Sequence, residues 1–173
     1  MSLFRRLVTA LLVILTVATQ SAVIAGWNLP GATPDLVLVV VAAFAMKQHA
    51  TRATLIGFGA GLLLDATPPS VTLLGSSAFT LAIVGFLAAQ LRTDLMRSPF
   101  APVLYVAAMG AGSVVLHAAL AGLLGDPSFS LLQIPLAALA SAIYCALLAM
   151  VVVPLVRVLL TFLMPAPTEF LRR

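Results

Sequence analysis

The sequence has very little charge. Of its 173 residues only 8% are charged, nine of them basic and five acidic, whereas 62% are hydrophobic. About a quarter of the residues in a soluble globular domain are charged, so the composition excludes an ordinary soluble fold. The single cysteine, Cys145, excludes an intrachain disulfide, and its place inside an apolar run is typical of a buried structural thiol.

The sequence also lacks the motifs of common catalytic and nucleotide-binding sites. It contains no P-loop, no HExxH zinc motif and no GxGxxG element. The formal net charge of +4 is spread over separate gaps between apolar runs, without an interleaved aromatic platform, so nucleic acid is not an expected partner. We therefore predict no catalytic residue, no metal ligand and no cofactor, and expect a non-enzymatic protein.

What the sequence does contain is a series of long apolar runs, with basic residues in every second gap. The gaps at 26–34, 66–75 and 125–130 hold no Lys or Arg. The other gaps and the chain ends hold all nine basic residues: Arg5, Arg6, Lys47, Arg52, Arg92, Arg97, Arg157, Arg172 and Arg173. Because cytoplasmic loops collect Lys and Arg, this alternation predicts six membrane crossings with both termini in the cytoplasm.

The predicted fold is all-α, a single membrane domain over residues 1–173 built as a compact bundle of six transmembrane helices. The approximate spans are 7–25, 34–48, 52–66, 76–91, 103–124 and 131–153. The first run, Leu7–Ala25, has 19 residues and is longer than the apolar core of a signal peptide, so we interpret it as an uncleaved helix. Pro154 is expected to break or kink the last helix, and residues 155–164 then form a cytoplasmic helix extension or an interfacial segment.

The second and third spans are short. A helix over Thr33–Gln48 rises about 24 Å, whereas the hydrocarbon core is about 30 Å thick. Two short crossings are favoured, and the alternative is a helical hairpin that dips into the membrane and returns. Thr33 as cap, Pro34 at the first helical position and Asp35 in the first turn predict the start of the second helix.

The segment GFGAGLLLD combines two glycines and a carboxylate. Gly57, Gly61 and Asp65 are four residues apart, so they share one face of a helix. A GxxxG pair permits close approach of a neighbouring helix in lipid. A carboxylate at a helix C-terminus opposes the helix dipole, so Asp65 requires an offset: the N-terminus of a neighbouring helix, a hydroxyl or a partner protein. The alternative is that Asp65 is simply hydrated at the interface.

Two sets of polar residues suggest other chemistry. Asp35, Asp65 and Asp126 are all predicted at the outer side and could form a cation or proton site. However, capping explains Asp35 and a turn explains Asp126. Ser113 and His117, one helical turn apart, could form a hydrolytic pair, but a histidine bonded to Ser113 or to neighbouring backbone inside the bundle is favoured.

Four segments in order resemble one known family. They are PDLVLVVVAAFA (34–45), GFGAGLLLD (57–65), LLGSSAF (73–79) and VGFLAAQLR (84–92). Together they are similar to the bacterial rod shape-determining protein MreD family. The resemblance is close over residues 30–95, and it extends over the whole chain in length and predicted topology.

The resemblance implies a non-enzymatic membrane scaffold of the cell-elongation (rod) complex in the bacterial cytoplasmic (inner) membrane, supporting sidewall peptidoglycan synthesis. It implies MreC as partner, with RodA, a class B penicillin-binding protein and MreB in the larger complex. It also implies a fold like that of the substrate-binding subunits of energy-coupling-factor transporters. The positions that it marks for helix packing or a partner interface are Pro34, Asp35, Gly57, Gly61, Asp65 and Gly75.

From these features we form the hypothesis that Gly57 and Gly61 line a groove that receives the transmembrane helix of MreC. Membrane lipid is a further expected contact, and a homodimer is left open. The alternative function is a vitamin-binding membrane subunit of an energy-coupling-factor type transporter. Few polar residues inside the spans, one Trp and two Tyr argue against it, because little is available to stack on a ring.

Overall fold

The structure is a computed structural model that describes residues 3–24, 34–67, 75–92, 98, 100–123 and 133–163. Within these residues the chain forms six α-helices and no strand, which confirms the predicted all-α class. The elements are α1 (Leu3–Thr19), continued by a short π-helical segment η1 (Gln20–Ile24), α2 (Leu36–Ala45), α3 (Ala50–Ala66), α4 (Ser76–Gln90), α6 (Ala101–Leu123) and α7 (Ile134–Leu163).

The helices follow the apolar runs of the sequence, with two informative differences. Helix α2 has only 10 residues and is shorter than the predicted span 34–48. Helix α7 has 30 residues and passes through Pro154 to Leu163. The chain is therefore not broken at that proline, and residues 155–163 extend the helix.

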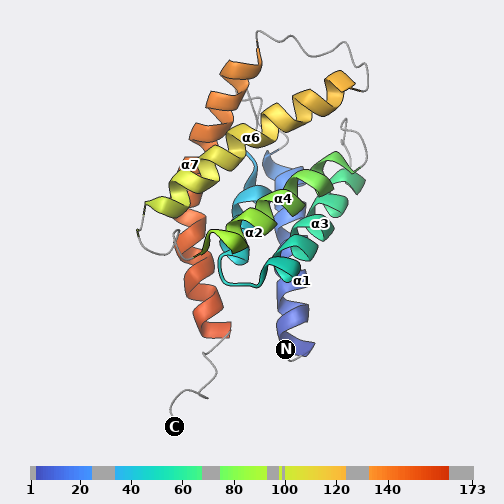
Figure 1. The fold of residues 1–173 in the computed structure, drawn as a ribbon. Helices are drawn as coiled ribbons and strands as arrows, with labels where there is room; N and C mark the ends of the chain where they lie inside the picture. Colours follow the sequence, from blue (N-terminus) through green and yellow to red (C-terminus); the bar gives the residue numbers. More distant parts are fainter. Residues whose placement is uncertain are drawn as a thin grey trace.

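Two antiparallel helix pairs, a central helix and the N-terminal helix α1 make up the described part of the molecule (Figure 1). The most extensive contact joins α3 to α4, and the next joins α6 to α7. Helix α2 contacts both pairs and also α1, so it lies between them. Tyr105 of α6 links the two pairs, because its hydroxyl donates a hydrogen bond of 2.7 Å to the Val84 carbonyl of α4.

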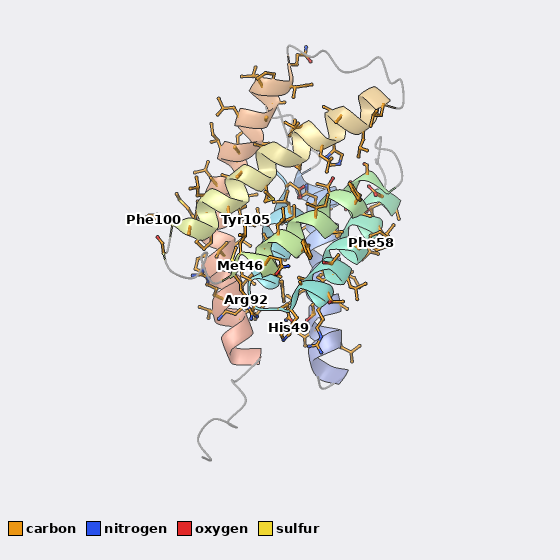
Figure 2. The ribbon with its side chains drawn as sticks, in the orientation of Figure 1. Met46, His49, Phe58, Arg92, Phe100 and Tyr105 are labelled. Carbon is orange, nitrogen blue, oxygen red and sulfur yellow. The ribbon has the colours of Figure 1, made fainter. Side chains whose placement is uncertain are left out.

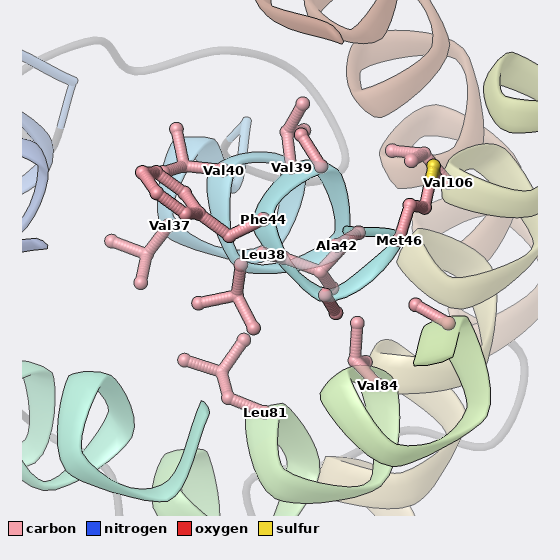
Figure 3. Packing of buried hydrophobic residues seen from close by; sticks show 14 of the residues in the cluster. Val37, Leu38, Val39, Val40, Ala42, Phe44, Met46, Leu81, Val84 and Val106 are labelled. Carbon is pink, nitrogen blue, oxygen red and sulfur yellow. The ribbon is translucent and has the colours of Figure 1, made fainter. Parts of the chain in front are cut away.

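Helix α2 is the centre of the hydrophobic core. Every residue from Val37 to Met46 is buried, so no side of this helix faces outward. Leu81 and Val84 of α4 and Val106 of α6 belong to the same buried cluster (Figure 3). Ten helical residues rise only about 15 Å, half of the hydrocarbon thickness of a bilayer. Because Val37–Met46 are all buried, other helices of the same chain cover α2 on every side.

One end of the molecule gathers several chain segments. The start of α1, the turn between α2 and α3, the end of α4 and the end of α7 all lie toward the lower end in Figure 1. Arg92 and His49 mark this end in Figure 2. Among the described residues, Lys47 lies in the turn between α2 and α3, Arg52 in the first turn of α3 and Arg92 after the end of α4.

The outer surface of the bundle is strongly apolar. Phe58 on α3 and Phe100 before α6 point outward on opposite sides (Figure 2). Among the described residues two helices could cross a membrane by length and composition, Ala101–Leu120 and Ile134–Leu159. Only 28% and 22% of their most apolar windows are buried within the molecule. A core helix of a soluble protein is buried by its own chain, whereas these two leave most of their apolar side chains outside. This pattern indicates membrane association.

Candidate functional site

The small residues of α3 and α4 bring the two helix backbones into direct contact. A Cβ atom added to Gly57 would collide with the Leu81 carbonyl of α4, and one added to Gly61 would collide with the Ala78 backbone. In the reverse direction, a Cβ on Gly85 of α4 would collide with the Ala53 carbonyl of α3. The close approach therefore depends on glycine in both helices, as in small-residue helix pairs in lipid.

This contact overturns the predicted partner groove. The face of α3 that carries Gly57 and Gly61 is filled by α4 of the same chain. The hypothesis that these two glycines receive a helix of another protein is wrong, because sequence spacing identifies a helix-docking face without identifying which helix docks on it.

Asp65 caps the N-terminus of α4 from the end of α3. Its Oδ2 atom accepts hydrogen bonds from the backbone N–H groups of Gly75 (2.8 Å) and Ala78 (3.3 Å). Gly75 is the N-cap residue of α4 and has φ +100°, a left-handed conformation that favours glycine. Since glycine has no side chain that could cap the helix, the carboxylate of Asp65 accepts the hydrogen bonds that an N-cap side chain would otherwise accept. The positive end of the α4 dipole also offsets the unfavourable place of Asp65 at the end of α3.

A second cap fixes the start of α2. Asp35 is the N-cap residue, and its Oδ1 atom accepts a hydrogen bond of 2.9 Å from the Leu38 N–H. The prediction that Thr33 caps this helix, with Pro34 as its first residue, is wrong, because the helix begins after Asp35. The carboxylate of Asp35 reaches the N–H group of the third helical residue and so acts as the cap. Thr33 itself lies outside the described residues.

The amide of Gln20 in η1 completes this helix start. Its Oε1 atom accepts from the Leu36 N–H at 2.8 Å, while its Nε2 atom donates to the carbonyl of the buried Pro34 at 3.1 Å. Gln20 thus satisfies one donor and one acceptor at the entry to the central helix. It was not among the predicted residues, although an amide within the first apolar run is itself a signal.

The carboxylates do not assemble into an ion site among the described residues. Asp35 and Asp65 cap different helices, and Asp126 lies outside the described residues. No group of three potential metal ligands occurs in the part of the chain that the structure describes. Near Asp65, two buried atoms have no hydrogen-bond partner in that part of the chain, its own Oδ1 and the Ser76 Oγ.

Ser113 and His117 are arranged for helix packing. The Ser113 hydroxyl donates to the Gly110 carbonyl at 2.8 Å, and the His117 Nδ1 atom lies 2.7 Å from the Ser113 carbonyl oxygen. The Ser141 hydroxyl of α7 donates to the same Gly110 carbonyl at 2.9 Å, and Cys145 packs against Gly110. Ser141 therefore joins α7 to α6, whereas Ser113 and His117 bond to the backbone of their own helix. The Ser113 hydroxyl is directed to backbone and not to the histidine ring.

A groove of about 550 Å³ lies between α1 and α3. Its polar end is formed by Thr9, Gln48 and Arg52, and its apolar walls include Val13 of α1 and Leu63 of α3. None of the lining residues is aromatic. The sequence did not predict this groove, because it forms between two helices separated by the whole of α2.

Comparison with other proteins adds no family to this geometry: no family model, no curated protein and no solved structure matches the chain.

Proposed function

We propose that this chain is a multi-pass membrane protein of the bacterial cytoplasmic membrane with both termini in the cytoplasm, in which the short helix α2 lies inside the bundle. The outward apolar faces of α6 and α7 support a lipid environment. The basic residues support the orientation: Lys47 and Arg52 flank the start of α3, Arg92 follows α4 and Arg157 is near the end of α7, all toward one end of the molecule (Figure 1).

Within that membrane the chain acts as a non-enzymatic scaffold of the rod complex that binds MreC, as its resemblance to the MreD family implies. The observation that carries this proposal is the use of the motif residues. Asp35, Gly57, Gly61, Asp65 and Gly75 each hold one helix of the bundle against another or fix a helix start. The motif residues therefore hold the bundle together, and Asp35 Oδ1 and Asp65 Oδ2 are occupied by structural contacts. Such a bundle acts through its outer surface.

The MreC helix then contacts an outer apolar face and not the α3–α4 interface. Purification of the tagged full chain from detergent-solubilised membranes tests the role. We expect MreC to co-purify, with RodA and the class B penicillin-binding protein in smaller amount, and we expect depletion of the chain to round the cells. Recovery of a transporter ATPase pair in place of MreC would support the alternative vitamin-binding subunit and contradict the scaffold.

The described residues give the vitamin-binding alternative little support. The α1–α3 groove has the volume of a ligand site, which is roughly 300–1,000 Å³. However, its walls are aliphatic, and a ring-shaped vitamin would find no aromatic residue to stack on. We therefore retain the scaffold as the proposed function.

A further inference from the structure

We propose that the groove between α1 and α3 binds one anionic phospholipid from the cytoplasmic leaflet, with its phosphate at Arg52 and Gln48 and an acyl chain along the apolar walls. This inference rests on the membrane orientation proposed above but not on the identity of any protein partner. It is carried by the polarity, dimensions and charge of the groove, and by a buried amide side chain that lines its polar end.

The polarity of the groove follows the direction of the bundle. Gln48 and Arg52 lie at the start of α3, the end proposed to face the cytoplasm, whereas Leu55, Gly59 and Leu63 follow along the helix toward the membrane interior. A ligand that fills the groove must therefore be polar at one end and apolar along the rest of its length. A phospholipid of the inner leaflet enters a lateral groove in that orientation.

The dimensions match one leaflet. From Arg52 to Leu63 the helix rises about 16 Å, close to half of a hydrocarbon core about 30 Å thick. A volume of about 550 Å³ is that of a small-ligand site. A transmembrane helix about 10 Å across and 30 Å long occupies more than ~2,000 Å³, so it could place only a ridge of side chains here.

Gln48 shows that the groove is adapted to a polar group. Its side chain is buried, with 7% exposed, and it lines the groove. Its NH₂ group can donate a hydrogen bond to a phosphate or ester oxygen of a lipid in the groove.

The charge at this end favours an anion. Arg52 is exposed at the mouth of the groove, and Lys47 is exposed in the preceding turn. Of the described carboxylates, Asp35 caps α2 at its start and Asp65 lies at the last turn of α3, so both are at the opposite ends of their helices from this mouth. Basic pockets between membrane helices on the cytoplasmic side are typical sites for anionic lipid headgroups.

The test uses native mass spectrometry of the purified full-length chain with added phosphatidylglycerol or phosphatidylcholine of identical acyl chains. We expect one phosphatidylglycerol molecule to be retained about fivefold more tightly than phosphatidylcholine, the difference that one basic residue near a lipid phosphate provides. Arg52→Gln should remove this preference, and Gly59→Leu should fill the groove and weaken binding of both lipids.

Two matched controls separate the groove from lipid bound to the outer surface. Gly112 of α6, like Gly59, has open space where a Cβ atom would be added, and Arg92, like Arg52, is an exposed arginine toward the proposed cytoplasmic end. Gly112→Leu and Arg92→Gln should leave lipid binding unchanged.

The proposal is overturned if Arg52→Gln keeps the preference for phosphatidylglycerol, or if Gly112→Leu weakens binding as much as Gly59→Leu does. It is also overturned if Gly59→Leu retains the lipid but loses a co-purifying protein, because the groove would then hold a partner helix. Because Arg52 is exposed, Arg52→Gln remains informative even if Gly59→Leu does not fold. Extraction of the chain from membranes by alkaline carbonate would contradict the proposed function separately.

Discussion

At the scale of single residues, the polar side chains of this protein mostly complete backbone hydrogen bonds. Asp65 and Gly75 show the principle most clearly. The left-handed conformation of Gly75 makes glycine the favoured residue, which removes the side chain that usually caps a helix, and a carboxylate 10 residues earlier takes its place. Because the hydrocarbon core of a membrane has no water to satisfy backbone polar groups, each such hydrogen bond stabilises a membrane protein more than it would in water.

Replacement of Asp65 tests this cap. Asp65→Ala leaves the Gly75 and Ala78 N–H groups without a carboxylate and should lower the free energy of unfolding by about 1–3 kcal/mol. Asp65→Asn should lower it less, because the amide oxygen still accepts a hydrogen bond. Thermal unfolding in detergent, followed by circular dichroism, measures both.

Thr67→Ala provides the control for that experiment. Thr67 lies two residues further along the chain, and its hydroxyl bonds to the Leu63 and Leu64 carbonyls of its own helix. This variant should unfold close to the wild-type temperature. An Asp65→Ala variant as stable as Thr67→Ala would show that the cap contributes little.

The sequence indicated some of these residue roles but not their partners. Spacing placed Asp65 at the unfavourable end of a helix and predicted a need for an offset, which the start of α4 supplies. Gln20 was missed because its partners, the Pro34 carbonyl and the Leu36 N–H, are 14 and 16 residues away and become neighbours only when α1 and α2 pack. Contacts of this kind depend on tertiary structure and have no local pattern.

At the scale of elements, the α3–α4 pair is held at a distance that only small residues permit. The three glycines of α3 differ in what surrounds them. A Cβ on Gly57 or Gly61 meets α4 backbone, whereas Gly59 has open space on the other side of the helix. Gly59 therefore serves as a control, within the same helix, for substitutions at Gly57 and Gly61.

Alanine substitutions at these three positions should have opposite effects. Gly57→Ala and Gly61→Ala should each lower the free energy of unfolding by about 1–3 kcal/mol, because the backbone of α4 must move away. Gly59→Ala should raise it by up to about 1 kcal/mol through helix propensity alone. Equal behaviour of all three variants in thermal unfolding would show that α3 and α4 do not approach as closely as described.

The element scale is also where the sequence was most informative. Apolar runs separated by Pro-, Gly- and charge-containing gaps located the six helices of the described residues, because burial and lipid exposure both require continuous apolar segments. The runs could not show that α2 lies at the centre. A helix buried by protein on every side and one exposed to lipid have the same composition, and only the packing of α1, α3, α4, α6 and α7 around α2 distinguishes them.

At the scale of the whole molecule, we propose that the bundle lies within the membrane with its basic end in the cytoplasm. Lys47 and Arg92 are exposed toward that end, and Leu123, the last residue of α6, is exposed at the other. Cys145 is the only cysteine of the sequence and is fully buried. A Cys145→Ala background therefore has no native thiol that could react with the label.

The most direct test is labelling of single cysteines in spheroplasts with a membrane-impermeant maleimide. We expect Leu123→Cys to be labelled in intact spheroplasts, whereas Lys47→Cys and Arg92→Cys should be labelled only after the membrane is permeabilised. Labelling of Lys47→Cys or Arg92→Cys from the outside, or equal labelling of all three positions before permeabilisation, would contradict the proposed arrangement.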